Sequence, residues 1–224
     1  MIKPILFNTD MVRAIQNGTK TATRRLIKHP YYIDKEDVCR KSGLAMHVGI
    51  NATHGMPYPD NPYDVADILY VRETWSVDNH NWLYRADFSD TDLEKLKNIM
   101  RWGPSIHMPK KIARIFLRVT KVTIERLQDI KIADIVSEGA SETCQECFEN
   151  YGNGFQCCIG ENDECRIYDD TMSNWQDLWN GTIRKSDLDK YGWNANPWVW
   201  VIEFERISKE EAYGTEFMKE NKGG

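Results

Sequence analysis

The chain has 224 residues, of which 41% are hydrophobic and 11% are aromatic, and its formal net charge at pH 7 is −5. This length and composition suit one domain with a hydrophobic core and large insertions. The acidic balance argues against a protein that coats nucleic acid indiscriminately. No apolar run approaches the roughly 20 residues that span a bilayer, and Asn8 and Asp10 interrupt the amino-terminal apolar stretch too early for a signal peptide. We therefore expect a cytoplasmic protein without a membrane partner.

The charges are unevenly distributed along the sequence. Residues 1–30 hold six Lys or Arg against one Asp, and residues 101–126 hold seven against one Glu. Residues 134–170 hold ten Asp or Glu against one Arg. The first two segments could form a basic face that attracts phosphate. Ordinary solvated faces explain the same pattern equally well.

The amino-terminal segment predicts a strand, a helix and a second strand. Residues 3–7 read as the first strand, and Thr9 or Asp10 can cap the helix that follows, because a side-chain oxygen there accepts from unpaired amides of the first turn. Gly18 is expected to end the helix in a left-handed conformation. Residues 21–27 are expected to form a turn that leads to a strand. The predicted apolar face of the helix consists of Met11, Val12 and Ile15.

The middle of the chain begins with residues 28–64, which lack periodicity and are interpreted as a long loop or insertion. Residues 67–77 and 81–88 are predicted to be paired strands, joined by a turn at residues 78–80. Residues 91–100 have the pattern of a short amphipathic helix.

The rest of the sequence predicts further strands and helices. Residues 112–127 alternate apolar and polar side chains and predict one long bent strand or two. Residues 130–139 return to helical spacing, and 172–182 predict another helix with Trp175, Leu178 and Trp179 on one side. Residues 197–207 are the strongest predicted strand, and the polar tail from 208 to 224 is expected to fray. Five to six strands among short helices predict an α+β fold, a small mixed β-barrel with helices packed outside.

Several motifs in this order resemble the ASCH family, whose members have a barrel related to the RNA-binding PUA domains. The resemblance is to the longer ASCH proteins of phages and prophages, and it implies one domain over residues 1–207, with insertions at 28–64 and 141–168. The motifs are Gly18-x-Lys20-x-x-x-x-Arg25, DILYVRETW (67–75) after an altered Ala66-Asp67 turn, SIHMP (105–109), LQDIKIADIVSEGA (127–140) and YGWNANPWVWVIEFERI (191–207).

The resemblance implies a catalytic site, because some ASCH proteins are amidohydrolases that remove the acetyl group of N4-acetylcytidine. The catalytic positions correspond to Lys20, Thr23 and Glu138. A Thr hydroxyl is a poor nucleophile until a base takes its proton, and a partly buried lysine amine can be that base. A carboxylate can carry a proton to the leaving amine, and Arg25 can hold a phosphate or a carbonyl oxygen. Lys20 and Thr23 converge only if residues 18–23 form a turn, because strand positions three apart point to opposite faces.

Each catalytic candidate also has a structural interpretation. Lys20 could be a solvated lysine after a helix, and Thr23 an ordinary strand residue. Glu138 lies near a helix end whose dipole favours cations, which hints at another role. Arg24 is expected to be solvated.

Three further residues are candidate ligand contacts. Glu73 could pair with Arg25 or Arg72, or accept a hydrogen bond from a base amine. Trp75 could stack on a base or belong to the core. His107 could contact a ligand, act as a general acid or base, or be a polar core residue.

The cysteines predict a structural zinc site. Five of them lie within 22 positions, and in a cytosolic chain metal binding is favoured over disulfides. Cys39 stands apart and is expected to be an ordinary thiol. The predicted zinc ligands are Cys144, Cys147, Cys165 and one of Cys157 and Cys158.

Taken together, the sequence supports several functions. The first is binding of RNA or a modified nucleoside in a basic cleft near Lys20, Arg25, Glu73 and His107. The second is hydrolysis of an N4-acylated cytidine in that cleft. An RNA-cleaving activity and a non-catalytic binding module are the alternatives. No organic cofactor is expected.

Overall fold

The computed structural model describes residues 2–28, 62–140 and 167–214. The chain divides into two compact units that are interleaved in sequence. Unit 1 comprises Met1–Thr21, Pro62–Val122 and Ile202–Gly224, and unit 2 comprises Ala22–Asn61 and Thr123–Val201.

The described residues form a mixed five-stranded sheet and a separate two-stranded hairpin. The order in the larger sheet is β1-β3-β6-β7-β2, and the hairpin pairs β4 with β5. β1 is parallel to β3, and β3 is antiparallel to β6. The α+β prediction is therefore confirmed, with seven strands where five to six were expected. Their bounds are β1 (Ile2–Leu6), β2 (Ala22–Leu26), β3 (Ile68–Arg72), β4 (Trp75–Asp78), β5 (Asn81–Tyr84), β6 (Phe116–Arg126) and β7 (Trp198–Ile207).

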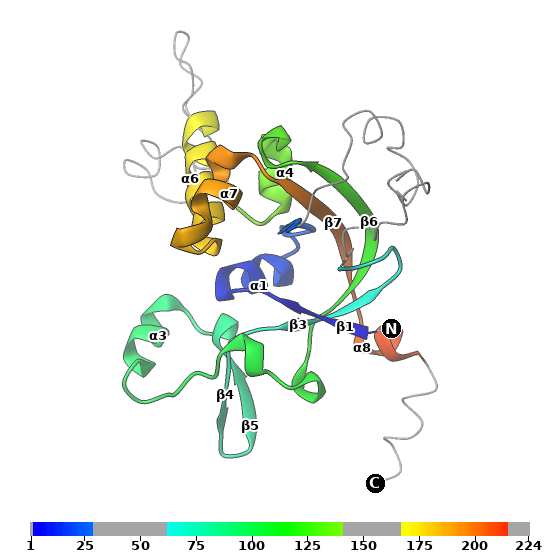
Figure 1. The fold of residues 1–224 in the computed structure, drawn as a ribbon. Helices are drawn as coiled ribbons and strands as arrows, with labels where there is room; N and C mark the ends of the chain where they lie inside the picture. The colour runs from blue at the N-terminus through cyan, green and yellow to red at the C-terminus, as the bar shows by residue number, and fades with distance from the viewer. Residues whose placement is uncertain (1, 29–61, 141–166, 215–224) are drawn as a thin grey trace, which may run out of the picture. The chain divides into compact units, whose positions relative to one another are not determined.

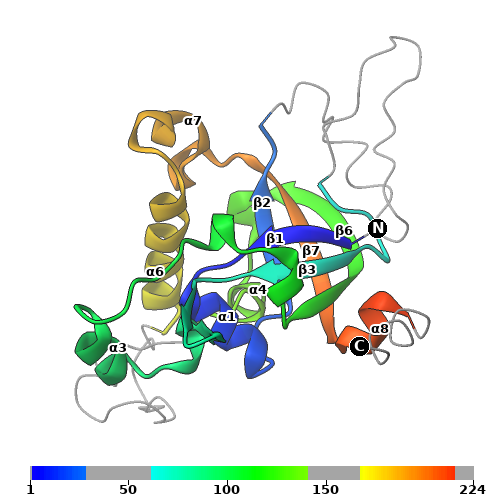
Figure 2. The ribbon, with the colours of Figure 1, turned by 90° about the horizontal axis from the view of Figure 1, so that it is seen from below.

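The helices are short, apart from one in unit 2. In unit 2, α4 contacts both α6 and β2, and α4 and β2 are seen side by side in Figure 2. Ile135 of α4 is buried in one cluster with Trp175 and Trp179 of α6, as expected for the tryptophan face of that helix. The helix bounds are α1 (Thr9–Gln16), α3 (Asp90–Leu96), α4 (Ile132–Ser137), α6 (Ile167–Thr182), α7 (Leu188–Tyr191) and α8 (Lys209–Tyr213).

The cap of helix α1 lies one residue before Thr9, the first of its two predicted positions. Asn8, and not Thr9 or Asp10, is the capping residue, because its side-chain oxygen accepts from the amide of Met11 at 2.8 Å. Gly18 has a φ of 85°, so the left-handed helix end predicted there is confirmed. Helix α4 ends in the same way, before Gly139 with a φ of 86°.

The predicted strand 67–77 is interrupted. β3 ends at Arg72 and β4 begins at Trp75, because the amide of Glu73 donates to Met108 Sδ, away from the sheet ladder. β4 then pairs with β5 through a two-residue turn, Asn79 and His80, both with positive φ as a type I′ turn requires. Figure 1 shows this hairpin projecting from the end of β3.

Two other predictions are corrected or sharpened. β6 is a single 11-residue strand, which settles the choice between one strand and two. The prediction of a frayed tail is wrong for residues 209–213, which form α8. Its first turn is closed by Ser208 and Glu211, each of which bonds the backbone amide of the other.

Replacing Ala66 with glycine is expected to stabilise the protein. Ala66 has a φ of 69°, a left-handed conformation that costs an L-residue about 1–2 kcal/mol. Glycine removes this strain, but the greater entropy of the unfolded chain offsets about 0.4–1 kcal/mol of the gain. We therefore expect the free energy of unfolding to rise by up to about 1.6 kcal/mol. Asp67 keeps the turn in place, since its carboxylate accepts from Lys3 Nζ at 2.6 Å and from the amide of Asp64 at 2.8 Å.

Urea unfolding of Ala66→Gly measures this effect. The matched control is Ala133→Gly, at an exposed position of α4, which should lose about 0.5–1 kcal/mol. Equal destabilisation of both variants would contradict the strain at Ala66.

Candidate active site on strand β2

Strand β2 buries polar side chains on both of its faces. Thr23 is 1% exposed and Arg24 is 4% exposed. Successive strand residues point to opposite faces, so the hydroxyl and the guanidinium enter different environments. A strand held only by packing would carry apolar residues at such positions.

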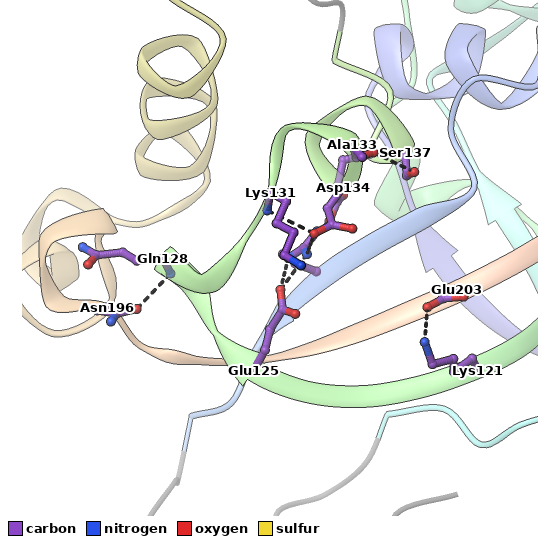
Figure 3. A network of polar contacts seen from close by, with 11 residues as sticks. Lys121, Glu125, Gln128, Lys131, Ala133, Asp134, Ser137, Asn196 and Glu203 are labelled. Atoms are coloured by element: carbon purple, nitrogen blue, oxygen red, sulfur yellow. Dashed lines mark hydrogen bonds and ion pairs between the residues drawn. The ribbon is translucent and has the colours of Figure 1, made fainter. Parts of the chain in front are cut away.

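The Arg24 guanidinium is surrounded by three carboxylates of unit 2. Arg24 Nε donates to Glu125 Oε1 at 2.7 Å, and Nη1 donates to Glu138 Oε1 at 3.2 Å. Asp134 Oδ2 lies 3.7 Å from Nη2. Figure 3 shows that Glu125 reaches this point from β6 and Asp134 from α4. The predicted solvation of Arg24 is therefore wrong, because its partners lie on elements more than 100 positions away in sequence.

This cluster contains more negative than positive charge. The side chains of Arg24 and Glu138 are each 2% exposed, whereas Glu125 and Asp134 are partly open to solvent. Burial raises the pKa of Glu125 above its usual value, although Arg24 acts in the opposite direction. Glu138, just after the end of α4, is a buried partner of Arg24.

On the other face of β2, Thr23 interacts with Arg25. Arg25 Nη1 donates to Thr23 Oγ1 at 2.7 Å and also to the carbonyl oxygen of Arg24 at 3.0 Å. Arg25 is half-buried, so its guanidinium holds the hydroxyl oxygen while part of its surface remains accessible. A cation that donates to a hydroxyl oxygen also stabilises the alkoxide that forms when the hydroxyl loses its proton.

Lys20 belongs to unit 1 and is 2% exposed, so its interpretation as a solvated lysine is wrong. Its amine lies 5.3 Å from the centre of the Phe7 ring, and its amide donates to the carbonyl of Ala14. The turn expected over residues 18–23 is present only in its first part: residues 18–21 are neither helix nor strand, whereas Ala22 and Thr23 already belong to β2.

Glu73 is held by Arg114, a residue that the sequence analysis did not single out. Arg114 Nε donates to Glu73 Oε1 at 2.8 Å and Nη2 donates to Oε2 at 2.9 Å, while Nη1 reaches Asp87 at 2.7 Å. Burial raises the pKa of Glu73 despite this pairing. Arg72, one of the predicted partners, donates instead to the carbonyls of Met108 and Ile106.

Trp75 and His107 have different surroundings in unit 1. Trp75 is half-buried and packs against an apolar cluster, and its buried indole N–H has no partner among the described residues. His107 is exposed, which excludes the polar core interpretation.

The candidate residues therefore fall into two sets. Thr23, Arg25 and Glu138 belong to unit 2, where Thr23 and Arg25 are in direct contact. Unit 1 contains Lys20, Glu73, Trp75 and His107. Residues 29–61 of the predicted loop 28–64 lie outside the described residues, and so do Cys39 and the predicted zinc ligands Cys144, Cys147, Cys157, Cys158 and Cys165.

Two further features concern other classes of site. Within the described ranges, no three His, Cys, Asp or Glu side chains are arranged to hold a metal ion. In the same part of the chain, each helix is too short or too polar to cross a membrane. A cavity of about 300 Å³ in unit 2 has none of the predicted site residues in its lining, which consists of Asn180, Leu188, Asp189, Gly192, Trp193, Asn194 and Ala195.

The buried polar groups of β2 thus form the candidate active site. No protein family, curated protein or solved structure matches the chain.

Proposed function

We propose that this chain is a cytoplasmic ASCH-type protein with a PUA-like barrel, which binds RNA or a modified nucleoside and hydrolyses the N4-acyl amide of N4-acetylcytidine. Two lines of argument support the proposal: the ordered set of ASCH-like motifs, and the burial of polar side chains at the motif positions. The observation that carries most weight is the hydrogen bond from Arg25 to the buried hydroxyl of Thr23. It gives the proposed nucleophile a cationic neighbour in a protected environment.

The proposed reaction converts N4-acetylcytidine and water into cytidine and acetate. Thr23 Oγ attacks the acetyl carbonyl carbon, the hydroxyl proton goes to a base, and the bond between that carbon and N4 breaks. The amine leaves as cytidine after it takes a proton. Water then hydrolyses the threonine ester, which releases acetate and restores the hydroxyl. Arg25 stabilises the oxygen of Thr23 as it loses its proton.

The roles proposed for the other residues are those implied by the resemblance to the ASCH family. Lys20 is proposed as the base, and Glu138 is proposed to transfer the proton to the leaving amine. Arg24 is a positioning residue in this scheme, since it holds the carboxylate of Glu138 in one orientation.

Incubation of the protein with N4-acetylcytidine tests the proposal. Formation of cytidine that is lost in Lys20→Ala supports hydrolysis. Binding of the nucleoside without turnover would favour a non-catalytic module, and shortening of an added RNA would favour a nuclease. Either of these outcomes contradicts the amidohydrolase assignment.

The cysteine-rich segment is proposed to hold one structural zinc ion. Elemental analysis of protein purified without chelator is expected to find about one equivalent of zinc. Cys144→Ser should lose the metal, whereas Cys39→Ser, the matched control, should keep it. Less than about half an equivalent in the wild-type protein would contradict the site.

A further inference from the structure

One face of the β4–β5 hairpin in unit 1 is unusually aromatic. Alternate residues of a strand share a face, and the register pairs Trp75 with Tyr84 and Val77 with Trp82. The Trp75 and Trp82 rings lie 5.5 Å apart, so the aromatic residues form a continuous row along the hairpin.

This face becomes more exposed toward the turn. Trp75 and Tyr84 are half-buried at the base of the hairpin, whereas Trp82 is 41% exposed and Val77 is 55% exposed. An indole with this exposure, next to a second indole that supports it, is a preformed surface for stacking.

Cations lie over the same aromatic row. The guanidinium carbon of Arg114 is 3.9 Å from the centre of the Tyr84 ring, and Lys111 Nζ is 6.0 Å from the centre of Trp82. Both distances fall within the range of cation–π attraction. Positively charged side chains therefore lie directly over aromatic rings in this part of unit 1.

The segment that carries these cations also has unbalanced charge. Arg118 is paired with Glu205, and Lys121 is paired with Glu203. In contrast, Arg101, Lys110 and Lys111 have no carboxylate partner within the described part of the chain. These three positive charges remain available to an anionic ligand.

Backbone contacts join this segment to the hairpin. The amide of Gly103 donates to the carbonyl of Trp75 at 2.7 Å, and Ser76 Oγ donates to the carbonyl of Arg101 at 2.9 Å. These contacts hold residues 101–103 against β4, and Lys111 and Arg114 lie over rings of the aromatic row. Lys110 precedes Lys111 in the chain, and its amine lies over the rings of Tyr70 and Tyr213. We call this set of residues the hairpin surface: Trp75, Val77, Trp82 and Tyr84 with Arg101, Lys110, Lys111 and Arg114.

We propose that the hairpin surface binds single-stranded RNA, with a base stacked on Trp82 and phosphates held by Arg101, Lys110 and Lys111. A nucleic acid strand supplies bases that stack on an exposed indole and regularly spaced negative charges that complement the cations of this surface. The strand must be single, because only an unpaired base offers its face for stacking on a side chain. This inference rests on the RNA-binding part of the proposed function, but it uses none of the residues assigned to hydrolysis.

Fluorescence anisotropy with a short labelled oligouridylate tests the inference. We expect Trp82→Leu, which keeps apolar area but loses the ring, to weaken binding on the order of tenfold. Trp82→Phe should bind within about threefold of wild type, since a phenyl ring still stacks. Lys110→Ala with Lys111→Ala should lower the slope of log Kd against log salt by about 1.4. Lys121→Ala, an exposed but paired lysine, is the matched control and should leave affinity and slope unchanged.

The inference is overturned if wild-type protein does not bind the oligouridylate, if Trp82→Leu binds as tightly as wild type, or if Trp82→Phe loses as much affinity as Trp82→Leu. Because the probe contains no acetyl group, this result is independent of N4-acetylcytidine hydrolysis. RNA binding without hydrolysis of N4-acetylcytidine would contradict the enzymatic proposal but support RNA binding at the hairpin surface. Hydrolysis without RNA binding would support the enzymatic proposal and contradict RNA binding at the hairpin surface.

Discussion

Replacing Arg24 with methionine is expected to lower the free energy of unfolding by about 3–5 kcal/mol. Methionine can fill the space of the arginine stem, but it leaves the carboxylate of Glu138 without its guanidinium partner. The side chain of that glutamate is 2% exposed, so water cannot replace the lost charge. The loss of a charged partner by a buried carboxylate is among the most destabilising changes that a single substitution can make.

A double substitution separates this effect from a loss of packing. Arg24→Met combined with Glu138→Leu should recover a large part of the stability, because the second change removes the buried carboxylate that has lost its guanidinium partner. Urea unfolding of both variants gives the comparison. The matched control is Arg118→Ala, which breaks an exposed pair with Glu205 and should cost no more than about 1 kcal/mol. A double variant less stable than Arg24→Met would show that the charge pair is not the reason.

Replacing Thr23 with valine is expected to lower kcat/KM for N4-acetylcytidine by about 10⁴-fold or more, as removal of a nucleophile does in hydrolases. Valine has nearly the same shape but no hydroxyl, so the proposed ester cannot form. Arg25 loses one acceptor, which should cost about 1 kcal/mol in stability. The protein should therefore remain folded while activity is lost.

Two substitutions control this experiment. Thr23→Ser keeps a hydroxyl and should retain measurable turnover. Thr120→Val removes a hydroxyl at an exposed position of β6 and should behave as the wild type. Undiminished turnover in Thr23→Val would exclude Thr23 as the nucleophile.

Local signals in the sequence predicted much of the fold. The left-handed glycine at 18, the turn before β5 and the tryptophan face of α6 all depend on residues close together in the chain. The boundaries were less accurate, as the shift of the α1 cap from Thr9 to Asn8 shows.

Long-range pairing explains the errors. The break between β3 and β4 occurs at Glu73, whose amide donates to Met108 Sδ, 35 residues away in sequence. The prediction that Arg24 is solvated is wrong for the same reason, because its partners Glu125 and Glu138 are even farther away in sequence. No periodicity within β2 distinguishes a buried arginine from an exposed one.

The sequence also predicted only some of the residues of the candidate site. The family resemblance selected Lys20, Thr23 and Glu138, and all three are buried. It gave no reason to select Arg24, although a second arginine beside a motif arginine should prompt a search for buried carboxylates. The hairpin surface could have been found from the alternation of residues 75, 77, 82 and 84 once the turn between the strands was predicted.

Proton NMR of wild-type protein with N4-acetylcytidine tests the central claim most directly, because it follows substrate and both products in one sample. We predict that acetate and cytidine appear in equal amounts as the substrate disappears, and that neither forms with Thr23→Val. An unchanged substrate signal in the presence of folded wild-type protein would contradict the proposed function.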